Sequence, residues 1–116
     1  MEIVIRNLDD SGNAKEFIDG SSRSAERLRT SYVGLGTYKV GWKWSEHAGK
    51  QTDKPSENHI GYIISGSFVV KGVSGEEKIV GPGQAFELSP GHDAWVHGEE
   101  PCVALDFGCT QKHESR

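Results

Sequence analysis

Three of the five histidines, His47, His59 and His92, stand where an imidazole could do chemistry. His47 ends a stretch with two tryptophans, His59 opens an apolar stretch, and His92 follows a Pro-Gly pair. An imidazole ligates first-row divalent metals and also titrates near neutral pH. These side chains could therefore hold a metal ion or transfer a proton, whereas we expect His97 and His113 to be solvated.

A carboxylate near His59 offers a second kind of chemistry. Glu57 lies two residues before His59, so the two side chains share a face if the strand begins that early. They could then act as an acid and base pair without a metal. The alternative is that Glu57 is a solvated carboxylate in a loop. Neither Cys102 nor Cys109 has an activating neighbour in the sequence, and we interpret both as structural or surface thiols.

The elements that must position these residues are short β-strands. From residue 32 onward the chain is rich in β-forming residues and is interrupted by Gly and Pro about every ten residues. Strands are expected at 32–40, 59–64, 68–70, 78–80, 85–88, 94–97 and 102–107. This pattern predicts an all-β sandwich or barrel.

The stretch that opens at His59 should form the first strand of a hairpin. Alternation places His59, Gly61 and Ile63 on one face and Ile60, Tyr62 and Ile64 on the other. The segment 65–67, Ser-Gly-Ser, is predicted to be the tight turn before strand 68–70, because glycine tolerates a positive φ.

The segment before residue 32 is polar, and we expect it to be irregular. Within it the sequence suggests a short edge strand at 2–6, a helical turn at 14–18 and a short helix at 24–29. Farther along, Trp42 and Trp44 alternate with polar residues and should share a face, and 48–58 reads as a loop or a poor edge strand.

The length and net charge of the chain limit the number of domains and the classes of partner that it can have. A chain of 116 residues predicts one domain. The formal net charge of −4 argues against nucleic acid as a partner, because phosphate binding needs a basic patch. No run of about 18 apolar residues is present, so no membrane span is predicted. The first residues are too short an apolar run for a signal peptide, and we expect a cytoplasmic protein.

From Trp42 to Phe107 the sequence resembles the cupins, which are small double-stranded β-helix (jelly-roll) barrels. Their first motif begins Gly-x5-His and ends with a glycine that follows the last ligand after six residues. The second centres on a Pro-Gly turn followed by His. The matching positions are Gly41 and His47, His59 and Gly66, Gly81-Pro82-Gly83, and Ser89-Pro90-Gly91-His92.

The resemblance implies a single cupin domain over 1–116 with its core barrel at about 32–108, and a homodimer formed through a sheet face or an exchanged edge strand. It also implies one divalent metal, Zn, Fe, Mn or Ni. The usual ligand set is incomplete here, because Gly49 and Ala94 stand at two histidine positions and His59 at a glutamate position. The set that remains is His47, His59 and His92.

Three functions agree with these residues. The first is binding of a small molecule in the barrel, with no activity assigned and with His59, Glu57, Trp44 and Trp95 as pocket candidates. The second is a metal-dependent dioxygenase or isomerase for a small polar substrate. The third is a structural or regulatory module that uses the barrel as a scaffold. The tryptophans could equally serve packing, which is their commonest role.

Overall fold

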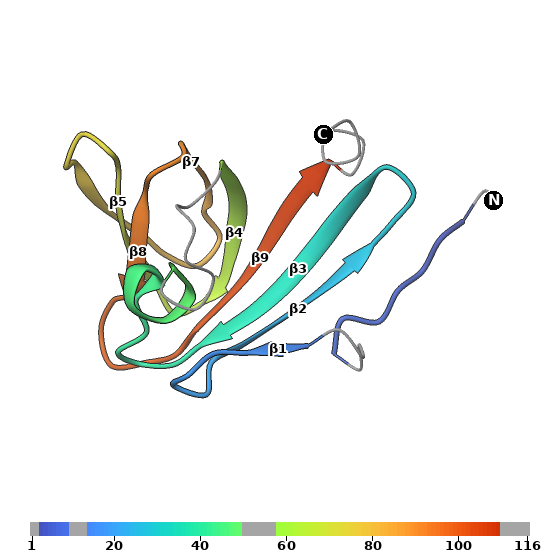
Figure 1. Cartoon of the computed structure of the whole chain (residues 1–116), viewed down its shortest axis with the longest axis horizontal. Helices are drawn as coiled ribbons and strands as arrows, with labels where there is room; N and C mark the ends of the chain where they lie inside the picture. Colours follow the sequence, from blue (N-terminus) through green and yellow to red (C-terminus); the bar gives the residue numbers. More distant parts are fainter. Residues whose placement is uncertain (1–2, 10–13, 50–57, 110–116) are drawn as a thin grey trace.

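Two antiparallel sheets form the part of the chain that the computed structural model describes, residues 3–9, 14–49 and 58–109 (Figure 1). The larger sheet contains, in spatial order, β1 (Lys15–Glu16), β2 (Ser22–Arg27), β3 (Ser31–Tyr38), β9 (Cys102–Cys109), β4 (His59–Ser65) and β7 (Ala85–Leu88). The smaller sheet contains β6 (Glu77–Val80), β5 (Phe68–Lys71) and β8 (Asp93–Val96). This is the jelly-roll barrel that the sequence predicts.

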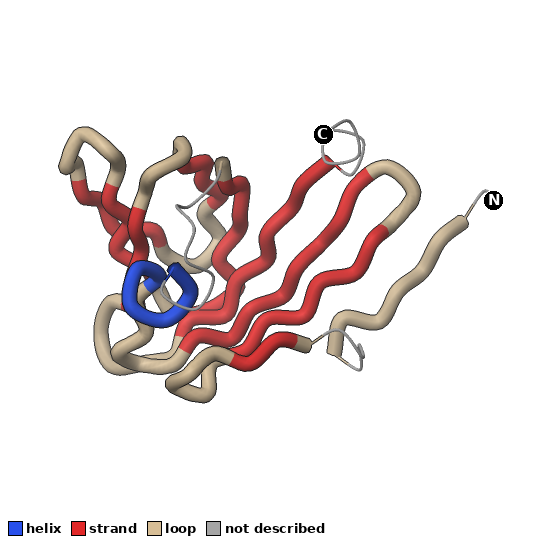
Figure 2. Tube along the Cα trace, viewed as in Figure 1, coloured by secondary structure: helices blue, strands red, loops and turns tan. Residues whose placement is uncertain are grey.

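One helical element lies among the described residues, a single π-helical turn η1 at Trp44–Ala48 (Figure 2). Ser45 holds this turn against β8, because its backbone N–H and its hydroxyl both donate to the Asp93 carboxylate, at 3.0 and 2.8 Å. Alternation had suggested that Trp42 and Trp44 share a strand face. That prediction is wrong, because Trp44 lies on this turn. No described helix is long and apolar enough to cross a membrane.

The long central strands run side by side and alternate between two faces. In β4, Gly61 and Ile63 are buried while Ile60, Tyr62 and Ile64 are exposed, which confirms the predicted alternation. In β9 the buried residues are Cys102, Ala104 and Asp106. The inner faces of these strands look toward the smaller sheet.

The predicted hairpin around Gly66 is wrong in its pairing. β4 pairs with β7 and β9 in the larger sheet, whereas β5 pairs with β6 and β8 in the smaller one. The turn is therefore a corner between sheets. Gly66 has φ of 73°, and a Cβ there would lie 2.2 Å from the Pro101 carbonyl oxygen. Glycine is needed at this corner for both reasons.

The N-terminal segment is more regular than expected. The predicted helix at 24–29 is a strand, β2, paired with β3 along its length, and the predicted helical turn at 14–18 contains β1. Helix propensity fails here because a six-residue segment gains more from pairing with a long neighbouring strand than from an isolated helical turn. Residues 3–7 form no strand, contrary to the expected edge strand.

The core is aromatic at one end of the barrel. Tyr38 lies between Trp42 and Phe68, with ring centroids 4.4 and 5.4 Å away, and Phe17 closes the group 5.8 Å from Trp42. Beside it Cys102 is fully buried, and burial raises the pKa of its thiol to about 12. Of the two roles that the sequence left open, structural or surface thiol, a neutral and inaccessible thiol agrees with the structural one.

Candidate functional site

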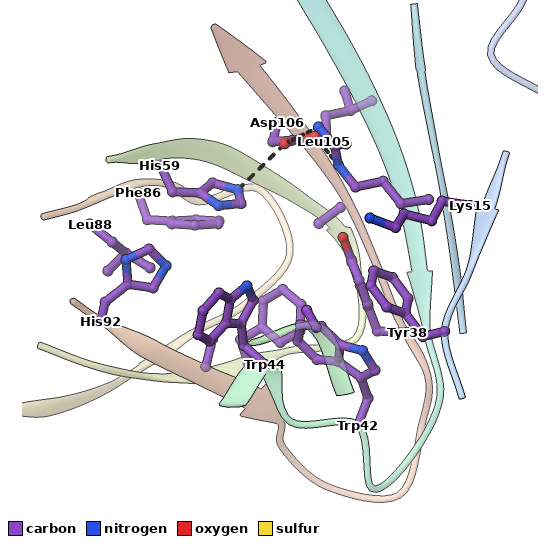
Figure 3. Close-up of a pocket in the computed structure, with 16 residues that line it drawn as sticks. Lys15, Tyr38, Trp42, Trp44, His59, Phe86, Leu88, His92, Leu105 and Asp106 are labelled. Carbon is purple, nitrogen blue, oxygen red and sulfur yellow. Dashed lines mark hydrogen bonds and ion pairs between the residues drawn. The ribbon is translucent and has the colours of Figure 1, made fainter. Parts of the chain in front are cut away.

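A cavity of about 600 Å³ lies inside the barrel. Its aromatic and apolar lining includes Trp42, Trp44, Phe86 and Leu88, and its polar lining includes Lys15, Arg23, Tyr38, His59, His92 and Asp106 (Figure 3). Lys15, Arg23, Tyr38 and Asp106 come from β1, β2, β3 and β9 and form a polar wall, whereas Trp44 lies on η1 and Phe86 and Leu88 on β7, so a bound molecule would meet a polar wall and an aromatic wall. This combination is typical of small-molecule sites.

An ion pair crosses the larger sheet on the polar wall. Arg23 on β2 donates from Nη2 to Asp106 Oδ2 on β9 at 2.7 Å and from Nε to Oδ1 at 3.3 Å. Strand β3 lies between them, so the guanidinium must pass over it. It passes over Gly34, where a Cβ would lie 2.1 Å from Asp106 Oδ1 and 2.7 Å from Arg23 Nη2. The missing side chain at Gly34 is what makes this ion pair possible.

A second glycine on β3 makes room for Tyr38. A Cβ at Gly36 would lie 2.3 Å from the Tyr38 hydroxyl, so the ring lies back over this glycine. Burial is the main cause that raises the pKa of Tyr38, and the nearby Asp106 carboxylate raises it further. The hydroxyl therefore stays protonated and can donate a hydrogen bond into the cavity.

His59 faces the same carboxylate. Its Nε2 lies 3.8 Å from Asp106 Oδ2, and its ring stacks on Phe86 with centroids 5.8 Å apart (Figure 3). Burial lowers the pKa of His59, and the attraction of Asp106 opposes this only in part. The imidazole is therefore neutral at pH 7 and can accept or donate one hydrogen bond.

His92 lies beside His59 in the cavity lining (Figure 3). It is buried, its Nδ1 is 2.9 Å from the Ser89 carbonyl oxygen, and its ring centroid is 5.9 Å from that of His59. Trp44 lies 6.5 Å from His92 on the other side. The cavity therefore brings together three of the residues selected from the sequence.

The other selected residues lie elsewhere or outside the described residues. His47 does not line the cavity, and its Nδ1 accepts a hydrogen bond from the Lys43 backbone N–H at 3.0 Å. Trp95 does not line it either, and its ring faces Lys43 Nζ at 5.0 Å. Glu57 lies outside the described residues.

The described residues do not fit a divalent metal. No group of three His, Cys, Asp or Glu side chains among them could hold an ion. His59 and His92 supply two nitrogens, but the nearest carboxylate, Asp106, already binds the Arg23 guanidinium. A metal beside Asp106 would also be repelled by that guanidinium. The predicted set of His47, His59 and His92 is not assembled here.

Sequence reasoning missed four polar residues of the cavity, Lys15, Arg23, Tyr38 and Asp106. Two signals were available. Asp106 is the one charged residue in the apolar stretch from Cys102 to Phe107, and such a residue usually has a partner. Gly34 and Gly36 occur two apart on a strand, which indicates close approach of other groups on that face.

The comparisons with known proteins agree with this fold. No family model matches the sequence, and none of the curated protein sequences matches it. Solved structures do match: KdgF from Halomonas sp. has a TM-score of 0.65 at 17% identity, with 94% of this chain and 97% of that chain covered. An RmlC-like cupin from Shewanella frigidimarina has 0.60 at 14%, covering 89% and 87%.

A third match is a protein from Silicibacter pomeroyi described as a sugar phosphate isomerase of a cupin superfamily. Its TM-score is 0.65 at 17% identity, and the match covers 89% of this chain and 73% of that chain. Identities this low establish the architecture and leave the chemistry to the site itself. The chain has the cupin fold, as its motifs predicted.

Replacing Gly34 with Ala should break the ion pair, because the new methyl group would occupy the position of Asp106 Oδ1. We expect Gly34→Ala to lower the free energy of unfolding by about 1–3 kcal/mol, since the buried polar groups lose their partners. Chemical denaturation measures this change. Gly72→Ala is the matched control, because a Cβ there meets nothing closer than 4.0 Å. Equal effects of both changes would contradict this account of Gly34.

Acid should destabilise the fold through His59. Its pKa is lower in the folded chain than its ordinary value of 6.5, so the unfolded chain takes up the proton first. The stability is therefore complete above pH 6.5 and is lost as the pH falls below that value and through the lower pKa of the folded chain. Denaturation at pH 7 and pH 5 should show a smaller loss in His59→Gln than in the original protein, with His97→Gln as the exposed control. An NMR titration that gives His59 a pKa above 6.5 would refute this.

Proposed function

We propose that the protein binds a small molecule in the barrel cavity. The observation that carries this proposal is the pairing of an aromatic wall with a polar wall around about 600 Å³ of space. Trp44 and Phe86 offer flat apolar surfaces, while Arg23, Asp106 and His59 can fix the orientation of a polar group. One of the structural neighbours is a sugar phosphate isomerase, and a small-molecule ligand agrees with that kind of barrel.

The two other functions considered from the sequence have less support. A metal-dependent enzyme would need a third ligand that the described residues do not supply. A barrel that served only as a scaffold would gain stability from a filled interior, because each buried void removes dispersion contacts. A large cavity with charged groups in its wall lowers the stability of the fold, and a ligand-binding role gives a reason for keeping it.

Filling the cavity should abolish binding. Ala94 and Ala104 both line it and are buried, so Ala94→Phe and Ala104→Phe each place a ring in the space. A fragment mixture screened by amide NMR should shift residues of β4, β8 and β9 in the original protein. Either variant should weaken that binding by about tenfold or more, because a rigid wall excludes an overlapping ligand.

Val103→Phe is the matched control. Val103 lies next to Ala104 on β9, and its side chain points to the outer face and does not line the cavity. Two separate filling variants keep the test valid if one of them folds poorly. Fragment shifts that avoid the cavity in the original protein, or that persist in both filled variants, would contradict the proposal.

We also infer that two copies of the chain associate through the outer face of the larger sheet. Four large apolar side chains are exposed there, Ile60, Tyr62, Ile64 and Phe107, and Ile60 is directly paired with Phe107. A contiguous apolar face of this kind marks an interaction surface. The centre of this face is apolar, and the charged Glu87 on β7 borders it beside Ile60. An apolar centre is complementary to itself, which is what a two-fold contact requires.

A charge on this face should prevent association. Ile60→Lys should shift the molar mass measured by light scattering from dimer to monomer, because a lysine cannot be buried between two apolar faces without a partner. Ile79→Lys is the matched control, since Ile79 is also exposed but lies on β6 in the smaller sheet. A monomeric original protein, or the same mass for both variants, would rule out this interface.

A further inference from the structure

The polar wall of the cavity has more hydrogen-bond donors than acceptors. Lys15 Nζ and the Tyr38 hydroxyl line the cavity, and neither is joined to another described residue by an ion pair or hydrogen bond. The Trp42 indole Nε1 is buried and has no hydrogen-bond partner among the described residues. Trp42 and Tyr38 are both more than nine-tenths buried, at 4% and 8% exposed.

The carboxylate of the same wall is already engaged. Both carboxylate oxygens of Asp106 accept from Arg23, through its Nε and Nη2. The Arg23 guanidinium keeps further N–H groups, since it carries five and these two contacts use two of them. An unsatisfied buried donor costs free energy, so the buried donors of Tyr38 and Trp42 favour a molecule that supplies oxygens.

The charge of the cavity lining also favours a ligand with negatively charged oxygens. Arg23 and Asp106 neutralise each other, so Lys15 carries the positive charge that no other described residue of the cavity lining compensates. In Figure 3 the Lys15 side chain and the Tyr38 hydroxyl are directed to the same side of the cavity, the side where Asp106 lies. A negative group placed between them would meet a cation and a neutral donor.

We infer that the ligand is a small organic acid whose oxyanion accepts hydrogen bonds from Lys15, Arg23 and Tyr38. This inference rests on the proposed small-molecule function and adds the class of ligand. Carboxylates and phosphates share this chemistry, because both present several oxygens that bind guanidinium and ammonium groups through charge-assisted hydrogen bonds.

The aromatic wall indicates what kind of group the ligand carries at the end away from its oxyanion. Trp44 and Phe86 line the cavity on the side of His92 and His59, and the rings of His59 and Phe86 are stacked. A planar or apolar group would pack against these rings while the oxyanion stays at the donors. The ligand therefore has an acidic head and an apolar or cyclic body.

A matched set of probes tests this. We compare 3-phenylpropionate, its neutral amide and 2-phenylethyl phosphate by isothermal titration calorimetry at low salt and neutral pH, with amide NMR to locate each site. One of the two acids should bind the cavity about tenfold or more tightly than the amide, since the acid gains a charge-assisted contact. Which acid binds more tightly distinguishes a carboxylate ligand from a phosphate ligand.

Two variants assign the preference to the donors. Lys15→Met should reduce the affinity for the preferred acid about three- to tenfold and leave the amide nearly unchanged, because Lys15 is exposed and its charge is partly screened. Tyr38→Phe should act in the same direction without changing the net charge. Lys71→Met is the matched control, since Lys71 is exposed on β5 and does not line the cavity.

The outcomes separate the two proposals. If the amide binds the cavity as tightly as both acids, or if Lys15→Met and Tyr38→Phe weaken all three probes equally, the acid inference is wrong and small-molecule binding stands. If neither acid binds, the acid inference is wrong as well. The proposed function fails only if the fragment mixture also leaves the cavity residues unshifted.

Discussion

The ion pair between Arg23 and Asp106 is the interaction on which the polar side of the cavity depends. It joins the second strand of the chain to the last one, and it spans the strand between them. The Asp106 side chain is 12% exposed and that of Arg23 is 29% exposed, so neither charge is well solvated and each needs the other. Gly34 has to be a glycine for the pair to form at all, since any side chain there would take the same space.

This constraint decides what the histidines can do. His59 lies 3.8 Å from a carboxylate that the guanidinium already holds, so Asp106 is not available as a metal ligand. The same pairing engages both oxygens of Asp106 and leaves Lys15 and Tyr38 as donors. This is why we propose an anion, and not a cation, as the ligand of a site with two neighbouring imidazoles.

The sequence predicted the architecture well because the signals for it are local. The strands at β3, β4, β7 and β9, the inward position of His59 and the special conformation of Gly66 all follow from alternation, propensity and turn chemistry within a few residues. The cupin motifs then identified the barrel. The same local signals misplaced β2 as a helix and paired β4 with β5, since the partner of a strand is set by contacts far along the chain.

The site was harder to predict from the sequence, because its residues also come together through contacts between distant parts of the chain. Arg23 and Asp106 are 83 positions apart, and no spacing rule connects them. Their meeting is encoded by Gly34, a residue with no side chain, and by the register that sets Gly34 opposite Asp106. His59 was found because a motif marks its position, but its chemistry depends on a neighbour that the motif does not contain. The polar wall of this cavity is therefore specified by the space that its glycines leave as much as by its charged side chains.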